Sequence, residues 1–240
     1  MKYAKDFLNH KILLSMKKFN FTSPVLEVGC GTGETLKELS KLYNIKGVDL
    51  SDDALNICRT KGLAVEKRDL FNVSERFNSI ICVDVVEHIS DDQLFANHLY
   101  KVLNPGGKIF VLVPSGKFLK DDEAFGHYRR YSRSAIIKLL KSSNFVIEST
   151  EMFGYPIFYY ARIMMNFLYR DHAHEAKGLK ERTLESSYKN PFDNTVFVKI
   201  LDSLLKMPLM SKLLFKFFEF QNCFVNGNKG FAVIVIASKA

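Results

Sequence analysis

Three glycines at alternate positions are the sharpest chemical feature of the sequence. Gly29, Gly31 and Gly33 follow a short apolar run and precede a polar stretch. Glycines spaced in this way let the backbone turn tightly and let a ligand touch the main chain. The dinucleotide-binding fingerprint would need a glycine where this chain has Glu34, whose negative charge disfavours a pyrophosphate. The turn therefore indicates a ligand with a positive centre and no phosphate.

Two acidic residues follow the next apolar runs. Asp49 ends one such run, and Asp69 comes shortly after another. If the runs are parallel strands, their carboxyl ends share one edge of a sheet, which is where ligands bind in such folds. Each acid also has a structural alternative, since Asp49 could cap the helix that begins near Asp52 and Asp69 could cap a short turn. Their shared position at strand ends favours ligand binding.

Two histidines further along the chain are candidates for general base catalysis. His88 follows Glu87 after the fourth apolar run, and His127 lies in the segment 126–132. Imidazole titrates near neutral pH, so either side chain could accept a proton from a substrate. The alternatives are structural: the Glu87–His88 pair could order its loop, and the 126–132 segment could begin a helix capped by Ser132.

The sequence predicts neither a metal site nor disulfide bonds. The four cysteines, Cys30, Cys58, Cys82 and Cys223, are scattered and form no Cys-x-x-Cys pair. The stretch 172–175, His-Ala-His-Glu, has one spacing that could hold a metal ion. No further ligand is evident, so a solvated loop is favoured there. We expect reduced thiols in a cytoplasmic protein.

The elements that would position these residues alternate along the chain. The strand candidates are Val25–Gly29, Ile45–Asp49, Ala64–Lys67, Ser79–Val83, Lys108–Val113, Phe145–Met152 and a last run from Gly230 to Ser238. The helix candidates are Lys2–Lys18, Glu34–Tyr43, Asp52–Lys61, Asp91–Leu103 and Ser134–Ser142, and Asn104–Gly107 is typical of a helix stop and turn. Alternation of this kind predicts a doubly wound α/β fold with a parallel sheet.

These segments resemble the motifs of the class I S-adenosylmethionine-dependent methyltransferases, in the family's order, from Val25 to Val113. Glu27 with the three glycines resembles the first motif, Gly47–Ser51 the end of the second strand, and 79–89 the fourth strand. Asn-Pro-Gly-Gly before the fifth strand is also typical of the family. The resemblance implies a Rossmann-like, seven-stranded sheet whose last strand is antiparallel.

The resemblance also implies a cofactor and its contacts. The cofactor would be S-adenosylmethionine, the product S-adenosylhomocysteine, and no metal is expected. In the family, an acid at the position of Asp49 accepts hydrogen bonds from both ribose hydroxyls, and an acid near Asp69 lies by the adenine amino group. The cofactor-binding residues implied in this chain are Glu27, Gly29, Gly31, Gly33, Asp49, Leu50, Asp69, Leu70 and Val83.

The acceptor side is less defined. The catalytic candidates are His127, His88 and Tyr131. The 126–132 segment resembles one found in a subgroup associated with sugars, quinones and lipid-linked precursors. We therefore expect a small, apolar or lipid- or sugar-linked acceptor, with O-methylation favoured over N-methylation. The alternatives are an N-methyltransferase of an amine, a cofactor-binding partner protein without catalysis, and a nicotinamide enzyme, which Glu34 disfavours.

Residues 155–226 are expected to form a helical insertion between the last two strands. It would cap the acceptor side of a core made of residues 1–154 and 227–240. The insertion is rich in Phe, Tyr, Met and Leu, which predicts an apolar pocket. Its lysines, among them Lys199, Lys206, Lys212 and Lys216, suit peripheral contact with the inner face of a membrane.

Composition sets outer limits on these expectations. The 240 residues fit one α/β domain with an elaboration, and the net charge of +8 favours an anionic partner or a membrane surface. Enzymes that methylate base amino groups carry Asn/Asp-Pro-Pro-aromatic where this chain has Val83–Val86, which argues against a nucleic-acid acceptor. No signal peptide or spanning segment is expected, and the oligomeric state is left open.

Overall fold

A computed structural model of the chain describes residues 2–119, 122–123, 125–168, 216 and 219–240. Its seven-stranded sheet has the order β3-β2-β1-β4-β5-β7-β6. The strands are β1 Val25–Val28, β2 Ile45–Asp49, β3 Val65–Lys67, β4 Phe77–Val83, β5 Leu103–Pro114, β6 Phe145–Phe153 and β7 Ala232–Lys239. β7 is antiparallel to both neighbours, β5 and β6. The predicted Rossmann-like fold with an antiparallel last strand is confirmed.

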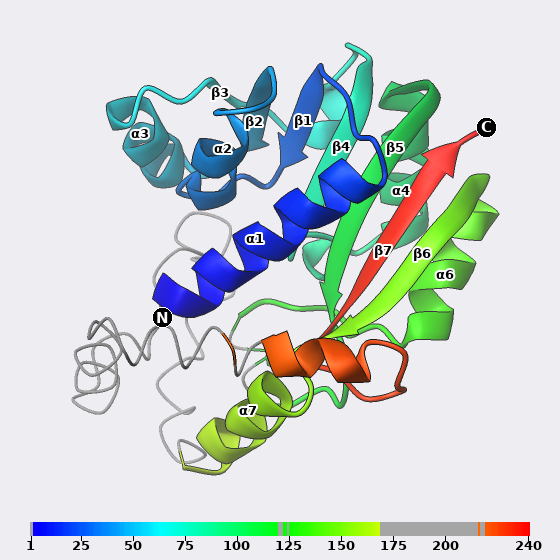
Figure 1. The fold of residues 1–240 in the computed structure, drawn as a ribbon. Helices are drawn as coiled ribbons and strands as arrows, with labels where there is room; N and C mark the ends of the chain where they lie inside the picture. Colours follow the sequence, from blue (N-terminus) through cyan, green and yellow to red (C-terminus); the bar gives the residue numbers. More distant parts are fainter. Residues whose placement is uncertain (1, 120–121, 124, 169–215, 217–218) are drawn as a thin grey trace.

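Helices cover both faces of the sheet. They are α1 Lys2–Lys18, α2 Glu34–Leu39, α3 Asp52–Thr60, α4 Asp92–Val102, α6 Arg133–Ser142 and α7 Ile157–Leu168, with the 3-10 turns η1 Leu70–Asn72, η2 Val86–His88 and η4 Gln221–Phe224. Side-chain oxygens cap three of them, since Ser51, Asp91 and Ser132 accept hydrogen bonds from backbone amides at the starts of α3, α4 and α6. In Figure 1, α1 crosses the front of the sheet and α4 and α6 lie behind it.

The central strands are apolar on consecutive residues because each face of the sheet is buried. Along β5, Ile109, Val111 and Val113 join the core under α4 and α6, whereas Phe110 and Leu112 join the core under α1 and α2. A strand covered on both sides must be apolar at successive positions. This layering places strand ends, rather than strand faces, at the surface.

The predicted boundaries need two corrections. The Asn104–Gly107 segment is not a separate turn, because it belongs to β5, where the pairing with β4 shifts register between Phe77 and Ser79. The helix predicted to reach Tyr43 ends at Leu39. Both differences lie where a helix passes into a strand, and at the first one β5 contains extra residues relative to β4.

The predicted site residues follow the carboxyl ends of the parallel strands, which lie at one edge of the sheet. β7 points upward in Figure 1 and antiparallel to β5, so β5 ends at the lower edge, on the side where α7 lies. Among the described residues, no helix is long and apolar enough to cross a bilayer. The 172–175 stretch and Lys199, Lys206 and Lys212 lie outside the described residues.

Candidate functional site

The glycine loop after β1 is held to the end of β2 by a short series of hydrogen bonds. The amide of Gly29 donates to the carbonyl oxygen of Val48 over 2.8 Å. The amide of Gly31 donates to Oδ2 of Asp49 over 2.8 Å, and the amide of Ser51 donates to Oδ1 of Asp49 over 2.9 Å. One carboxylate therefore fixes both the loop and the turn into α3, and each of its oxygens keeps a free acceptor site.

Glycine is required at two of the three positions for different contacts. At Gly29, with φ of 68°, an added Cβ would lie 2.4 Å from Cγ2 of Val85, in the loop after β4. At Gly33, with φ of 76°, it would lie 2.6 Å from Cδ1 of Leu63. At Gly31 it would meet nothing within 4 Å, so this position faces open space. The loop thus packs closely on both flanks and leaves its middle accessible to a ligand.

Glu27, in β1 just before this loop, is a buried carboxyl group. Its side chain is only 4% exposed, and Oε2 has no hydrogen-bond partner. Burial, followed by the charges of Glu34 and Asp49, raises its pKa to about 8. A buried carboxyl group surrounded by other acids favours a cationic ligand, because a cation both pairs with it and lowers its pKa.

The other residues predicted to bind the cofactor lie around the same edge of the sheet and differ in how exposed they are. Asp69 caps η1 by accepting the amide of Phe71 on Oδ1 over 3.0 Å, as its structural alternative required. Leu70 is 4% exposed and packs into the core, so its side chain is not available to a ligand. Leu50 is 44% exposed, and Val83 is half-buried at the end of β4.

Asp122 is a buried charge that organises the predicted acceptor side. Its carboxylate is 0% exposed and lies 2.9 Å from Nδ1 of His127. It also accepts hydrogen bonds from Nε of Arg130 and from Nη2 of Arg162, over 2.7 Å each. Burial alone would raise its pKa, but the hydrogen bonds from His127 and the amide of Leu119, with the charge of Arg130, hold it at about 2. An ionised carboxylate only accepts, so Nδ1 of His127 is the donor in this hydrogen bond and Nε2 points away from Asp122.

His127 meets the loop after β4. Its ring centroid is 4.7 Å from that of His88, and the amide of Tyr128 donates to the carbonyl oxygen of Glu87 over 2.8 Å. Burial, and then the nearby His127, lowers the pKa of His88 to about 4. Glu87 is 0% exposed and both of its carboxylate oxygens are without partners. One potential ligand atom from each of Glu87, His88 and His127 falls within 4.8 Å of the others.

Tyr131, the third catalytic candidate, has a structural role instead. It is 4% exposed, and its hydroxyl donates to Oδ2 of Asp92 on α4 over 2.7 Å. Burial and this contact with Asp92 raise its pKa above the usual tyrosine value. A phenol held in this way joins the start of α6 to α4, so the structure does not support Tyr131 as a catalytic residue.

Two residues of this edge were missing from the sequence-based candidates as functional groups. Asp122 lies in an acidic stretch in which nothing distinguishes it, and the sequence indicates Glu87 only as the neighbour of His88. Only the fold reveals them, because the groups around each of these side chains come from separate segments of the chain. Residues that come into contact only in the folded structure have no fixed spacing in the sequence.

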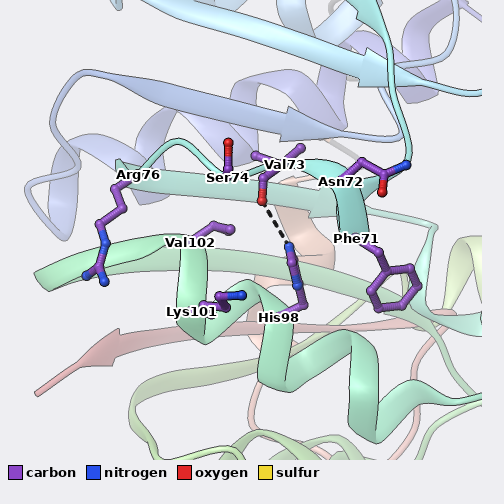
Figure 2. A pocket seen from close by; sticks show the side chains of 8 residues that line it. All are labelled: Phe71, Asn72, Val73, Ser74, Arg76, His98, Lys101 and Val102. Atoms are coloured by element: carbon purple, nitrogen blue, oxygen red, sulfur yellow. Dashed lines mark hydrogen bonds between the residues drawn. The ribbon is translucent and has the colours of Figure 1, made fainter.

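A cavity of about 190 Å³ lies elsewhere (Figure 2). One side is formed by η1 and the segment before β4, and the other side by the second half of α4. Nε2 of His98 donates there to the carbonyl oxygen of Val73 over 3.1 Å. The cavity is lined by Phe71, Asn72, Val73, Ser74, Arg76, His98, Lys101 and Val102. None of these is a predicted site residue. The cavity is therefore separate from the glycine loop and from His88 and His127.

Comparison with known proteins decides the family. A sequence model described as a methyltransferase domain matches residues 2–150. The chain belongs to the class I S-adenosylmethionine-dependent methyltransferases. S-adenosylmethionine is the cofactor of this fold, and the site fits it: Glu27 offers an orphaned acceptor for an ammonium, Asp49 has free acceptor sites for hydroxyls, and Gly31 faces open space.

The relatives of this methyltransferase act on different atoms. Norajmaline N-methyltransferase from Rauvolfia serpentina is 28% identical over 150 residues, which are 53% of this chain and 51% of that protein. A ubiquinone biosynthesis O-methyltransferase from Hydrogenovibrio crunogenus is 29% identical over 97 residues, 36% of this chain and 40% of that protein. The methyltransferase thus spans about half the length, or less, of these relatives, and both N- and O-methylation occur among them.

Solved structures share the fold of this methyltransferase over nearly the whole chain. A SAM-dependent methyltransferase from Archaeoglobus fulgidus has a TM-score of 0.59 and 17% identity, with 98% of this chain and 94% of that chain covered. A phosphoethanolamine N-methyltransferase from Haemonchus contortus, in complex with S-adenosylmethionine, has a TM-score of 0.56 and 16% identity, with 96% and 52% covered. At such identities the likeness shows the fold alone.

Proposed function

We propose that this protein transfers the methyl group of S-adenosylmethionine to an oxygen atom of a small, apolar acceptor. The bound cofactor supplies an electrophilic methyl group on a sulfonium. The residues of the chain do the rest: Glu27 and Asp49 hold and orient the cofactor, and the histidines receive the acceptor hydroxyl at the neighbouring strand end. Alignment of the two reactants and exclusion of water then provide most of the rate enhancement.

The arrangement of Asp122 and His127 is the observation that carries the proposal. A hydroxyl group must lose its proton as it is methylated, whereas a neutral amine needs no base to attack. Asp122 holds Nδ1 of His127 at 2.9 Å and so leaves Nε2 free to act on that proton, either by accepting it or by binding a metal ion that acidifies the hydroxyl. Neither task is needed for an amine acceptor, so the geometry favours oxygen.

The apolar character of the acceptor is proposed from α7. This helix is linked to the site because Nη2 of Arg162 donates to Asp122. Its Tyr160, Ile163 and Met164 are 53%, 43% and 50% exposed and present an apolar surface beside that link. We retain 155–226 as the proposed acceptor cap, and an apolar or lipid-linked acceptor suits this surface.

Peripheral contact with a cytoplasmic membrane face would deliver such an acceptor. Lys216 is exposed, in keeping with that proposal. Co-sedimentation with anionic vesicles at low and high salt tests the contact, with a variant in which Lys206, Lys212 and Lys216 are changed to Gln as the comparison. Protein that stays in the supernatant at low salt would contradict it.

Turnover with matched acceptors tests the methylation itself. Purified protein, S-adenosylmethionine and a panel of apolar phenols and amines would be assayed by mass spectrometry for S-adenosylhomocysteine and for the methylated product. We expect phenols to be methylated and His127→Ala to lose roughly a hundredfold or more in turnover, with cofactor affinity retained. His98→Ala, in the separate cavity, serves as the control.

Two outcomes would replace this proposal. Methylation of amines alone, with His127→Ala reduced only a few fold, would identify an N-methyltransferase that works by alignment. Tight binding of S-adenosylhomocysteine without turnover on any acceptor would favour a cofactor-binding partner protein. Loss of cofactor binding in Asp49→Ala, beside binding in the wild type, would keep the cofactor site in place in either case.

A further inference from the structure

The loop after β4 and the loop before α6 bring three potential metal ligands together. One ligand atom from each of Glu87, His88 and His127 lies within 4.8 Å of the other two. Ligand atoms bound at about 2.0–2.2 Å to one tetrahedral ion lie about 3.3–3.6 Å apart, so the three side chains would close by up to roughly 1.5 Å on binding. The cluster is therefore close to the size of a coordination site, and small side-chain rotations would complete it.

Glu87 is the observation that separates this cluster from an ordinary histidine pair. Its side chain is fully buried, and neither carboxylate oxygen has a hydrogen-bond partner among the residues that the structure describes. Ionising a carboxyl group in such a place is costly unless a cation accompanies it, because buried charges are normally paired or coordinate metals. Its backbone carbonyl accepts the amide of Tyr128, so the segment that carries His127 is fastened next to it.

The two imidazole groups are prepared to act as ligands. Nδ1 of His127 donates to Asp122, which fixes the ring orientation and leaves Nε2 as the free nitrogen. In metal sites, a histidine that binds the ion through one ring nitrogen usually donates a hydrogen bond from its other nitrogen to a carboxylate. The ring of His88 lies beside it, with a distance of 4.7 Å between the two ring centroids.

We propose that Glu87, His88 and His127 form a binding site for one divalent transition-metal ion. Two imidazole nitrogens and one carboxylate suit Zn²⁺, Fe²⁺, Co²⁺ or Mn²⁺ better than Mg²⁺ or Ca²⁺, which prefer all-oxygen sites. Three protein ligands leave further coordination positions open to water or to an acceptor oxygen. The ion's use in catalysis rests on the proposed O-methylation: a hydroxyl bound to it would release its proton to solvent more readily.

Metal binding can be measured without any acceptor. Untagged protein would be stripped with EDTA, dialysed, and titrated with Co²⁺ while its visible absorption is recorded, and with Zn²⁺ and Mn²⁺ by calorimetry. We expect one ion per chain, and roughly a hundredfold or greater loss of affinity in Glu87→Gln and in His88→Ala. Asp122→Asn, which removes a positioning group, should weaken binding by about 10–100-fold.

Controls keep the result interpretable. His98→Ala removes a half-buried histidine outside the cluster, and Cys223→Ser removes an exposed thiol, so both should bind as the wild type does. Binding of S-adenosylhomocysteine by each variant shows that the fold is intact. Absence of binding at millimolar metal, or equal affinity in Glu87→Gln and the wild type, would overturn the site.

The two proposals fail separately. A bound ion in a protein that methylates no hydroxyl acceptor would contradict the proposed function and leave the metal site standing. Methylation of phenols by EDTA-stripped protein that binds no ion would contradict the metal site and leave the proposed function standing. His127 would then act on the acceptor proton directly.

Discussion

Replacing Glu27 with Gln should abolish the pH dependence of cofactor binding. The carboxyl group is buried, and burial together with Glu34 and Asp49 raises its pKa to about 8. At pH 7 only about a tenth of the molecules then carry the charged form, by the ordinary titration relation. A cofactor whose ammonium requires that charge must remove a proton on binding. Affinity should therefore rise by nearly tenfold per pH unit between pH 6 and 7.5, with about 0.9 proton released per cofactor at pH 7.

The assay is calorimetric titration with S-adenosylhomocysteine at several pH values in two buffers of different ionisation enthalpy. The buffer dependence of the heat gives the number of protons released. In Glu27→Gln the release should vanish, and at pH 8 its affinity should be lower by about 1.5–3 kcal/mol, the range for hydrogen bonds to charged groups. Glu38→Gln, an exposed acid of α2 paired with Lys41, is the matched control. Equal pH slopes in the wild type and Glu27→Gln would refute the reasoning.

The same pKa gives a stability test with a definite sign. A carboxyl group whose pKa is raised on folding stabilises the folded state fully below its unfolded value of 4.5, and this contribution is lost as the pH rises towards about 8. The free energy of unfolding of the cofactor-free wild type should fall over that window relative to Glu27→Gln, by at most roughly 5 kcal/mol. Urea denaturation at pH 5 and pH 8.5 measures the difference. Bound cofactor should diminish it.

Three further predictions address the surrounding site. Asp49→Ala should weaken S-adenosylhomocysteine binding, as calorimetry would measure. Lost hydrogen bonds between the carboxylate and the cofactor account for roughly 1.5–3 kcal/mol. The loss should be larger than this, because the amides of Gly31 and Ser51 also lose their acceptor. Gly29→Ala should abolish binding, whereas Gly106→Ala, which has a similar φ but open space around it, should lose only about 1–2 kcal/mol of stability and bind normally. Asp122→Asn should lower turnover while cofactor affinity holds. The wild type should also lose the stability contributed by Asp122 as the pH falls from about 4 to 2, because the folded pKa is about 2; thermal melts of both proteins check this.

The sequence by itself determined the fold and the cofactor edge. Apolar runs on consecutive residues, separated by capped amphipathic stretches, specify strands buried on both faces, and right-handed crossovers then bring their carboxyl ends to one edge. Gly29, Gly33 and Asp49 were identifiable because their roles depend on local chain geometry: a positive φ, or a position at a strand end. Short-range constraints of this kind leave a spacing pattern that can be read directly.

Only the tertiary structure decided what the acceptor side contains. Tyr131 looked like a candidate beside His127 along the chain, yet its hydroxyl is bound to Asp92 on another helix. Asp122 and Glu87 looked ordinary, yet one organises the buried charges and the other is a carboxylate with no partner. The physical reason is that burial and electrostatic pairing depend on distances between segments, and the energy of a buried charge is set by whichever groups the fold places around it.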